Sequence, residues 1–310
     1  MQVLITGGAG FLGSHLVDRL IADGHNVTVF DNLLTGRLSN ISHLKSNPKF
    51  SLLQQDVTEN FKTDGPIDRI YHLASPASPV AYASHRIETM KVNSQGTWNL
   101  LDLSLEKKSR FLVASTSEIY GDPPKNIQRE DFWGNVNPIG LRSMYEEAKR
   151  FSEACAMAYN RERGADTRIV RIFNTYGPRM HPADGRVVTN FVRQALKDQP
   201  ITIAGDGTQT RSFCFVSDTV RGLAAVMEAD FSEPINIGNP EETPIIQLAK
   251  NILELLPESK SKITFEPRAD YDPRNRCPDI MRAKQILNWT PKIPLKEGLA
   301  KVVEYHRRET

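Results

Sequence analysis

The chain has 310 residues, of which 39% are hydrophobic and 25% are charged. These proportions are ordinary for a globular protein, and they argue against a disordered, collagen-like or membrane-embedded chain. The formal net charge of +2 gives no reason to expect a protein that binds nucleic acid through general electrostatic attraction. Recognition of an anion would have to come from a few placed arginines.

Cysteine usage and the first residues give an expectation for the compartment. The three cysteines, Cys155, Cys214 and Cys277, stand far apart, with no spacing that suits a zinc site or a disulfide framework. The first apolar run is broken by glycines within a few residues, and no window approaches the ~20 apolar residues that span a bilayer. We therefore expect a cytoplasmic protein without a metal ion and without contact to a membrane.

The first half of the chain alternates short β-branched runs with longer amphipathic stretches. Helical patterns cover 12–23, 86–107 and 143–163, and strands are predicted over 3–6, 27–30, 51–55, 68–74, 110–116 and 167–173. Runs that are apolar on both faces, alternating with helices, are typical of a parallel sheet covered on both sides. The sequence thus predicts an α/β fold with a Rossmann-like, doubly wound parallel sheet.

After Asn174 the pattern changes, because glycines and prolines cut the chain into shorter elements. Here strands are predicted over 212–216 and 234–238, and helices over 187–197, 217–228, 245–256, 278–287 and 295–307. We expect a Rossmann domain over 1–175 and a smaller α/β substrate-binding lobe over 176–310, with some segments returning to the first domain.

A glycine-rich motif lies between the first predicted strand and the first predicted helix. It reads Thr6-Gly-Gly-Ala-Gly-Phe-Leu-Gly13, with Gly7 at the tight turn, Gly10 where phosphates approach the backbone, and Gly13 where the helix packs on the strand. A pyrophosphate can be held there by backbone amides and the helix N-terminus. The alternative is a glycine-rich turn that holds no ligand.

Two acidic residues follow the next two strands. Asp31 ends the second strand, where a carboxylate can accept both ribose hydroxyls of an adenosine and repel a 2′-phosphate. Arg37 could hold such a phosphate, but the nearby aspartate disfavours it, so NAD is favoured over NADP. Asp56 is placed to meet the adenine amino group, or else it caps its own loop.

A second motif pairs Tyr145 with Lys149, four residues apart and so on one face of a helix. An ammonium beside a phenol, close to an oxidised nicotinamide, favours the phenolate and lowers its pKa, so Tyr145 could act as a base toward an alcohol. Most such pairs are surface pairs. This one gains weight because Ala114-Ser-Thr-Ser-Glu118 closes a strand whose end should face the same crevice.

These motifs resemble the extended short-chain dehydrogenase/reductases that act on nucleotide sugars. The runs HLASPASP from His72, STSEIYGDP from Ser115, WGNVNPIGLRSMYEEAKR from Trp133, RIFNTYGPRM from Arg171, DGRVVTNF from Asp184 and DGTQTRSFCFVSD from Asp206 resemble the UDP-glucuronate decarboxylases within that family. Ala148 departs from the pattern, since glycine is expected before the lysine in many relatives.

The resemblance implies roles for residues at both ends of the site. It implies Tyr145 as base and later acid, Lys149 as its electrostatic partner, Thr116 as a donor to the oxygen at carbon 4, Ser117 and Glu118 beside the ring and carboxylate, and Arg276 reaching in from the second lobe. It assigns to NAD the residues Gly7, Gly10, Phe11, Leu12, Gly13, Asp31, Asn32, Asp56, Val57, Leu73, Ala74, Asn93, Tyr145 and Lys149. It assigns to the UDP-sugar the residues Asn174, Arg179, Arg186, Arg211 and Arg276, the arginines being suited to the diphosphate.

The expected reaction is therefore the NAD-dependent oxidative decarboxylation of UDP-glucuronate to UDP-xylose by a homodimer. A 4,6-dehydratase of this fold needs an Asp-Glu pair, and Thr116-Ser117-Glu118 lacks the aspartate. The sequence also leaves open a decarboxylase that releases the 4-keto pentose, an apiose/xylose synthase and, from a different class, a non-catalytic NAD-sensing protein.

Overall fold

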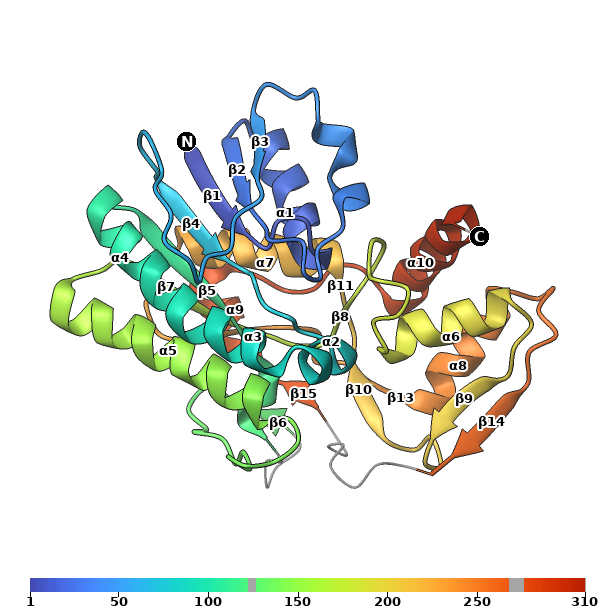
Figure 1. The fold of residues 1–310 in the computed structure, drawn as a ribbon. Helices are drawn as coiled ribbons and strands as arrows, with labels where there is room; N and C mark the ends of the chain where they lie inside the picture. Colours follow the sequence, from blue (N-terminus) through green and yellow to red (C-terminus); the bar gives the residue numbers. More distant parts are fainter. Residues whose placement is uncertain (122–126, 268–275, 310) are drawn as a thin grey trace.

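The computed structural model describes residues 1–121, 127–267 and 276–309 (Figure 1). Its centre is a seven-stranded parallel sheet in the order β12-β7-β5-β4-β1-β2-β3. The strands are β1 (Gln2–Thr6), β2 (Asn26–Phe30), β3 (Phe50–Leu53), β4 (Arg69–His72), β5 (Arg110–Thr116), β7 (Thr167–Ile172) and β12 (Ile235–Ile237). The order reverses at β1, which is the doubly wound arrangement predicted from the sequence.

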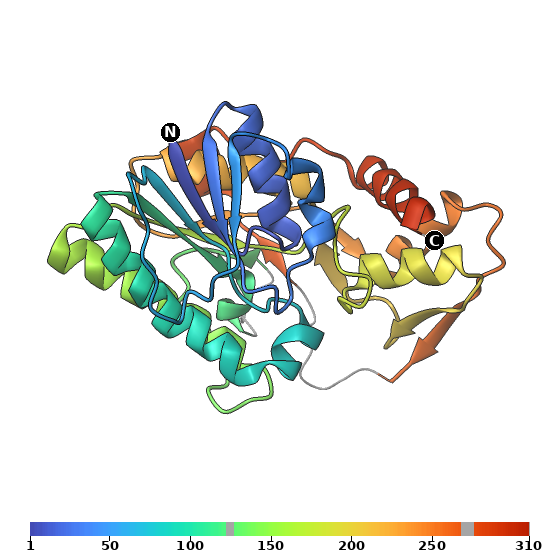
Figure 2. The same cartoon turned by 45° about the horizontal axis from the view of Figure 1, so that its top comes forward.

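Helices cover both faces of this sheet (Figures 1 and 2). One face carries α1 (Phe11–Ala22) and α7 (Val216–Glu228), and the other carries α4 (Thr97–Lys107) and α5 (Ser143–Arg163). Successive strand side chains point to opposite faces, so Val3 and Ile5 of β1 join one buried cluster while Leu4 joins the other. This is the physical reason why the central strands, such as β1 and β5, carry apolar residues that point to both faces.

The helix predicted over 86–107 is one helical course with a change of winding. It consists of α3 (Arg86–Lys91), a π-helical segment η3 (Val92–Gly96) and α4. Within η3, the Asn93 carbonyl accepts hydrogen bonds from Thr97 Oγ1 at 2.8 Å and from Ser152 Oγ of α5 at 2.6 Å. Through this carbonyl, η3 is hydrogen-bonded to the neighbouring helix α5.

A smaller lobe is built from the second half of the chain. Its helices are α6 (Val187–Leu196), α8 (Ile245–Glu254) and α10 (Leu295–Glu309). Its short strand pairs are β9 (Ile201–Ala204) with β14 (Ile263–Glu266), β10 (Thr210–Ser212) with β13 (Glu242–Pro244), and β11 (Cys214–Phe215) with β8 (Thr175–Tyr176). Figure 1 shows this lobe beside the end of the sheet at which β1, β4 and β5 finish.

Several short elements connect or border the two parts. β15 (Cys277–Pro278) pairs in parallel with β6 (Ile127–Gln128), and α9 (Met281–Leu287) packs on β12. The remaining elements are α2 (Pro79–Ser84) and the 3-10 turns η1 (Leu38–Asn40), η2 (Ser42–Leu44) and η4 (Ser117–Tyr120). Since β12 and α9 follow residue 176 but lie on the sheet, a domain boundary at about 175 stays a prediction.

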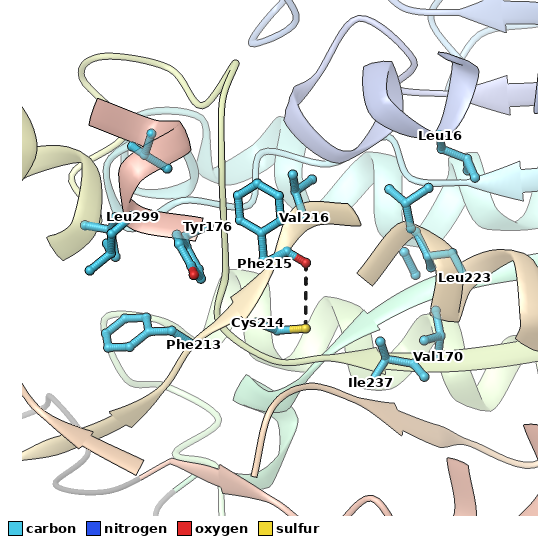
Figure 3. Packing of buried hydrophobic residues seen from close by; sticks show 14 of the residues in the cluster. Leu16, Val170, Tyr176, Phe213, Cys214, Phe215, Val216, Leu223, Ile237 and Leu299 are labelled. Carbon is cyan, nitrogen blue, oxygen red and sulfur yellow. Dashed lines mark hydrogen bonds between the residues drawn. The ribbon is translucent and has the colours of Figure 1, made fainter. Parts of the chain in front are cut away.

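One buried hydrophobic cluster runs from the sheet into the lobe (Figure 3). Leu16, Val170, Leu223 and Ile237 belong to the sheet side, whereas Tyr176, Phe213, Phe215 and Leu299 belong to the lobe side. Between them, the Cys214 thiol lies 3.8 Å from the Phe215 carbonyl. A shared core of this kind holds the lobe at a fixed position against the sheet.

Candidate active site

A cleft of about 650 Å³ lies where the strands of the sheet end and the lobe begins. Its lining comes from the turns after β1, β2, β4 and β5, from α5, from the segment 172–186 and from Arg276. In open α/β sheets ligands bind outside the carboxyl ends of the strands, at the point where strand order reverses. The cleft therefore has the position and size of a ligand site.

The glycine-rich turn forms one end of the cleft. Gly7 has φ +73°, and a Cβ there would lie 2.8 Å from the Ala74 backbone; a Cβ on Gly13 would lie 2.1 Å from the Gly7 carbonyl oxygen. Helix α1 starts after Gly10, and no side chain caps its first amides. Backbone amides at Phe11 and Leu12 are thus available at the cleft wall, as a pyrophosphate requires.

Asp31 is buried, with 7% of its surface exposed, and lies next to this turn. Its two carboxylate oxygens accept hydrogen bonds from Ala9 N and Leu33 N, both at 2.9 Å. Burial raises the pKa of the Asp31 carboxyl, and these two amides oppose the shift. Each oxygen keeps further acceptor capacity, which suits a ribose diol.

The two other groups considered for the adenosine also line the cleft. Arg37 donates to Asn40 Oδ1 and to the Arg179 carbonyl, each at 3.2 Å, so its guanidinium already has protein partners. Asp56 accepts hydrogen bonds from Asn32 Nδ2 at 2.8 Å and from the Thr58 amide at 2.9 Å. Burial would raise the pKa of Asp56, but its hydrogen bonds outweigh this and lower it.

Val57, Leu73 and Ala74 complete the cleft wall at this end, whereas Asn93 does not reach it. Asn93 is fully buried, and its Nδ2 donates to Ser75 Oγ at 2.9 Å and to the Thr89 carbonyl at 2.8 Å. Ser75 lines the cleft. The structure therefore places Asn93 one residue behind the surface that a cofactor would contact.

Tyr145 and Lys149 lie on one face of α5, as their spacing predicts, and both line the cleft. Lys149 Nζ donates to the Ala114 carbonyl at 2.8 Å and lies 5.9 Å from the centre of the Tyr145 ring. Burial lowers the pKa of Lys149 to about 7. It raises the pKa of Tyr145 to about 12, with the Glu118 charge adding and a hydrogen bond with Thr116 opposing.

The direction of the Tyr145 shift differs from the lowering expected from the motif alone. A buried phenolate loses its hydration, and the negative Glu118 lies in the same wall of the site. In this structure Tyr145 is therefore a neutral phenol at pH 7.

Ser117 and Glu118 lie in η4, directly after Thr116, whose hydroxyl caps this turn by accepting the Glu118 amide at 3.2 Å. The Glu118 carboxylate is buried and is contacted by Arg142 and, at 3.6 Å, by Arg276. Burial would raise the pKa of Glu118, but the two arginines outweigh it and lower the pKa. Arg276 reaches the cleft because β15 pairs with β6.

Of the residues expected at the UDP-sugar, Asn174, Arg179 and Arg186 line the cleft. Arg186 Nη2 donates to the Ala77 carbonyl at 2.6 Å, and Arg179 Nη2 lies 2.7 Å from Asp18 Oδ2 of α1. Arg211 is different. It lies on β10 of the lobe, where its Nη1 donates to the Thr210 carbonyl at 2.8 Å, and it is not part of the cleft wall.

Sequence reasoning missed two side chains that support the site. Tyr82 of α2 stacks on Tyr145 with ring centroids 4.9 Å apart and planes 13° apart, and Arg142 lies just before α5. For Arg142 a signal existed, because it precedes Tyr145 by three residues and Glu146 by four, which places it on the same helix face. For Tyr82 there was none, since α2 is brought over the site by tertiary structure.

Metal-ligand clusters and membrane-spanning helices are both absent from the described ranges. Within them, no three histidine, cysteine, aspartate or glutamate side chains are grouped as a metal site would require. Over the same residues, no helix combines the length and the apolar character needed to cross a bilayer.

The model of the NAD dependent epimerase/dehydratase family matches residues 3–238. The chain belongs to this family. Its cofactor is therefore NAD, and the residues present fit that group: a Cβ at Gly7 or Gly13 would collide with backbone atoms, and Asp31 presents its carboxylate beside this turn. Both the fold class and the cofactor predicted from the sequence are confirmed.

The relatives make the resemblance more specific. The chain is 50% identical to UDP-glucuronic acid decarboxylase 1 of Danio rerio, over 99% of its own length and 73% of that protein. It is 52% identical to UDP-glucuronic acid decarboxylase 1 of Arabidopsis thaliana, over 99% of its length and 70% of that protein. The resemblance inferred from the motifs is confirmed.

A solved structure shows the same fold with ligands. UDP-glucuronic acid 4-epimerase from Bacillus cereus, in complex with UDP-glucuronic acid and NAD, aligns with a TM-score of 0.87 and 28% identity. The alignment covers 100% of both chains.

Proposed function

We propose that the protein is a UDP-glucuronate decarboxylase that forms UDP-xylose. The observation that carries this is the placement of Glu118 and Arg276 beside Tyr145, in one cleft whose other end is the dinucleotide turn. About 50% identity to UDP-glucuronic acid decarboxylases over nearly the whole chain supports it.

The chemistry requires a temporary ketone in the sugar. NAD, when bound, supplies the reversible oxidation of the hydroxyl at carbon 4. The carboxylate on carbon 5 is then β to a ketone, so carbon dioxide leaves and the electron pair stays behind as an enolate. A proton added at carbon 5 and reduction at carbon 4 complete UDP-xylose, with no net change in oxidation state of the cofactor.

Tyr145, Thr116 and Lys149 act on the hydroxyl at carbon 4. Tyr145 takes the proton of the carbon 4 hydroxyl and later returns it, while Thr116 donates a hydrogen bond to the same oxygen. Lys149 stabilises the phenolate electrostatically and contacts the nicotinamide ribose. Because burial favours the neutral phenol, the positive charge of an oxidised nicotinamide bound nearby would be needed to favour the phenolate.

Ser117, Glu118 and Arg276 handle the carboxylate side of the ring. Arg276 binds the substrate carboxylate before it leaves, Ser117 orients it, and Glu118 orders the water or proton source near carbon 5. A planar guanidinium suits a carboxylate because it can donate two parallel hydrogen bonds.

The two remaining parts of the cleft are assigned to the cofactor and the nucleotide. The glycine turn and Asp31 bind the adenosine and pyrophosphate of NAD, with Phe11, Leu12, Asn32, Asp56, Val57, Leu73 and Ala74 as the surrounding wall. Asn174, Arg179 and Arg186 bind the UDP diphosphate. Asn93 supports Ser75 from behind, and for Arg211 a contact to UDP stays a prediction without support from the cleft geometry.

We also propose that the protein is a homodimer and that it is cytoplasmic. Large apolar side chains are exposed along α3, α4 and α5, namely Ile87 (61%), Met90 (49%), Trp98 (45%) and Phe151 (39%). Patches of this kind are typical of protein interfaces. Sedimentation tests the dimer: Trp98→Glu should convert the dimer to a monomer, and an already monomeric wild type would contradict it.

The cysteines support the proposed cytoplasmic location. All three are free and buried, which suits a reducing compartment.

The decisive experiment is incubation of the purified protein with UDP-glucuronate, followed by carbon dioxide measurement and NMR of the sugar product. Equal amounts of carbon dioxide and UDP-xylose are expected. Carbon dioxide with a 4-keto pentose or a branched pentose would identify one of the related decarboxylases instead. Water loss from a hexose nucleotide would identify a dehydratase, and cofactor binding with no turnover would identify an NAD sensor.

A further inference from the structure

Arg142 is a largely but not fully buried arginine to which the proposed reaction gives no role. It is the last residue before α5, and only 13% of its side chain is exposed. It is not among the residues that line the cleft, whereas Arg276 is. A buried guanidinium is costly unless it is paired, and its partners therefore indicate its role.

The main partner of Arg142 is the Glu118 carboxylate. Arg142 Nη2 donates a hydrogen bond to Glu118 Oε2, while Arg276 Nη1 lies 3.6 Å from Glu118 Oε1. The two oxygens of one carboxylate thus face arginines from two different elements. The contact with Arg142 is a direct hydrogen bond, and the contact with Arg276 is a longer ion pair.

Two further contacts fix the orientation of the Arg142 guanidinium. Its Nε lies 3.3 Å from Glu146 Oε1 one turn along α5, and its guanidinium lies 5.9 Å from the centre of the Tyr82 ring. Arg186 contributes further positive charge to Glu118, and Tyr145 lies beside Glu118 on the cleft side. Arg142 therefore connects the acid of the site with the aromatic stack that carries the base.

Arg142 and Arg276 differ in what they can do when a substrate binds. Arg276 lines the cleft and Arg142 does not, so only Arg276 can turn to a second carboxylate. If Arg276 did so without another cation behind Glu118, a buried carboxylate would lose its counter-charge and its orientation.

We infer that Arg142 is a positioning residue for decarboxylation, which holds the Glu118 carboxylate in place and so leaves Arg276 available to the carboxylate of the sugar. This inference rests on the proposed function. If wild-type protein releases no carbon dioxide from UDP-glucuronate, the proposed function fails; the inference is tested by differences between variants of an active protein.

The test compares Arg142→Gln and Arg142→Lys with wild type and with Arg161→Gln, an exposed arginine near the end of the same helix. Release of carbon dioxide is followed from substrate labelled in the carboxyl carbon. For Arg142→Gln we expect kcat to fall roughly 10- to 100-fold, as for other misplaced catalytic groups, with KM nearly unchanged. Arg142→Lys should recover part of the loss, and Arg161→Gln should match wild type.

The pH profile separates positioning from a merely structural role. Glu118 keeps a low pKa because Arg142 and Arg276 face it. Loss of Arg142 raises that pKa, so the acid limb of kcat should move to higher pH in Arg142→Gln and less in Arg142→Lys. An Arg142→Gln variant with wild-type kcat and an unmoved acid limb would overturn the inference.

A double variant covers the case in which Arg142→Gln does not fold. Glu118→Gln with Arg142→Gln removes both charges of the hydrogen-bonded pair, so neither member of that pair is left facing a missing partner. If Arg142 acts through Glu118, the double variant releases carbon dioxide at the rate of Glu118→Gln alone. A double variant that is slower than Glu118→Gln by a further ~10-fold or more would show an independent role for Arg142 and overturn the inference.

Discussion

The ring of Tyr145 lies against the ring of Tyr82, with centroids 4.9 Å apart and planes 13° apart. Tyr82 is held by α2, which begins after Ser78 caps it by accepting the Ala81 amide at 3.2 Å. Because both rings are buried, the phenol of Tyr145 has little freedom to turn. The direction of its hydroxyl is therefore set by two helices that are distant in sequence.

We expect Tyr145→Phe to abolish turnover while it leaves NAD affinity nearly intact. Phenylalanine keeps the stack on Tyr82 but lacks the hydroxyl that accepts and returns the proton. Loss of a general acid–base group typically lowers kcat ~10²–10⁴-fold. Carbon dioxide release and NAD titration measure the two effects. Tyr159→Phe is the matched control, because Tyr159 lies on the same helix as Tyr145 but does not line the cleft, and its hydroxyl donates to Asp102 of α4 at 2.8 Å. Unchanged turnover in Tyr145→Phe would refute the assignment of the base.

Asp31→Ala should weaken NAD relative to NADP. The variant loses the carboxylate that accepts the ribose hydroxyls and repels a 2′-phosphate, and a hydrogen bond to a charged group is worth about 1.5–3 kcal/mol, or roughly 10- to 100-fold in the ratio of Kd values. Titration with both dinucleotides checks this. Asp23→Ala at the exposed end of α1, where Asp23 pairs with Arg19, should not change the ratio. An unaltered ratio in Asp31→Ala would remove this residue from the cofactor site.

Gly13→Ala should destabilise the fold and prevent cofactor binding. The added Cβ would meet backbone atoms of Gly7 and Gly8 at 2.1 and 2.8 Å, which cannot move like a flexible side chain. We expect a loss of roughly 3 kcal/mol or more, at the upper end of overpacking effects, measured by urea denaturation. Gly24→Ala is the control, since its Cβ meets nothing and only its φ of +91° is strained, at about 1–2 kcal/mol. Equal losses in the two variants would contradict the close approach at Gly13.

Glu146→Gln should stabilise the protein at alkaline pH. Burial, followed by the charge of Glu118, raises the pKa of Glu146 from 4.5 to about 7. The folded state then binds this proton more tightly than the unfolded state, so wild-type stability falls as pH rises from about 4.5 to about 7 and stays reduced above.

The measurement for Glu146→Gln is the free energy of unfolding at pH 5 and at pH 8. The variant should gain on the order of 1 kcal/mol over wild type at pH 8 and little at pH 5. Glu147→Gln is a matched neighbour with a 40% exposed side chain and should show no such difference. A gain that is the same at both pH values would exclude titration as its cause.

The parts of the fold that the sequence predicts are those governed by local periodicity. The apolar runs predict the strands of the sheet, because their side chains are buried on both faces. The winding of η3 could not be predicted, since it depends on the Ser152 hydroxyl of another helix. The same holds for the start of α9 at Met281 rather than at Pro278, because Cys277 and Pro278 pair with β6.

In the candidate site, too, features within one turn or helix could be predicted, and those that depend on tertiary structure could not. Gly7 to Gly13 and the Tyr145/Lys149 pair are readable because their geometry lies within one turn or one helix. The partnership of Arg142 with Glu118 links residues 24 positions apart, and the stack of Tyr82 on Tyr145 depends on how α2 lies over α5. Arg211 was expected at the cleft, but the pairing of β10 with β13 fixes its strand in the lobe. The upward pKa shift of Tyr145 also follows from burial, which a sequence motif does not report.

The last strand of the sheet, β12, has a consequence for synthesis of the protein. β12 pairs with β7, although the two strands are far apart in the sequence. β7 ends at Ile172 and β12 begins at Ile235, with several elements of the lobe between them. At translation rates of ~5–20 residues per second, the outer edge of β7 stays open on the ribosome for roughly 3–12 s. An open strand edge is a template for pairing with other nascent chains. Crowded polysomes should therefore be the place where this protein most needs a chaperone.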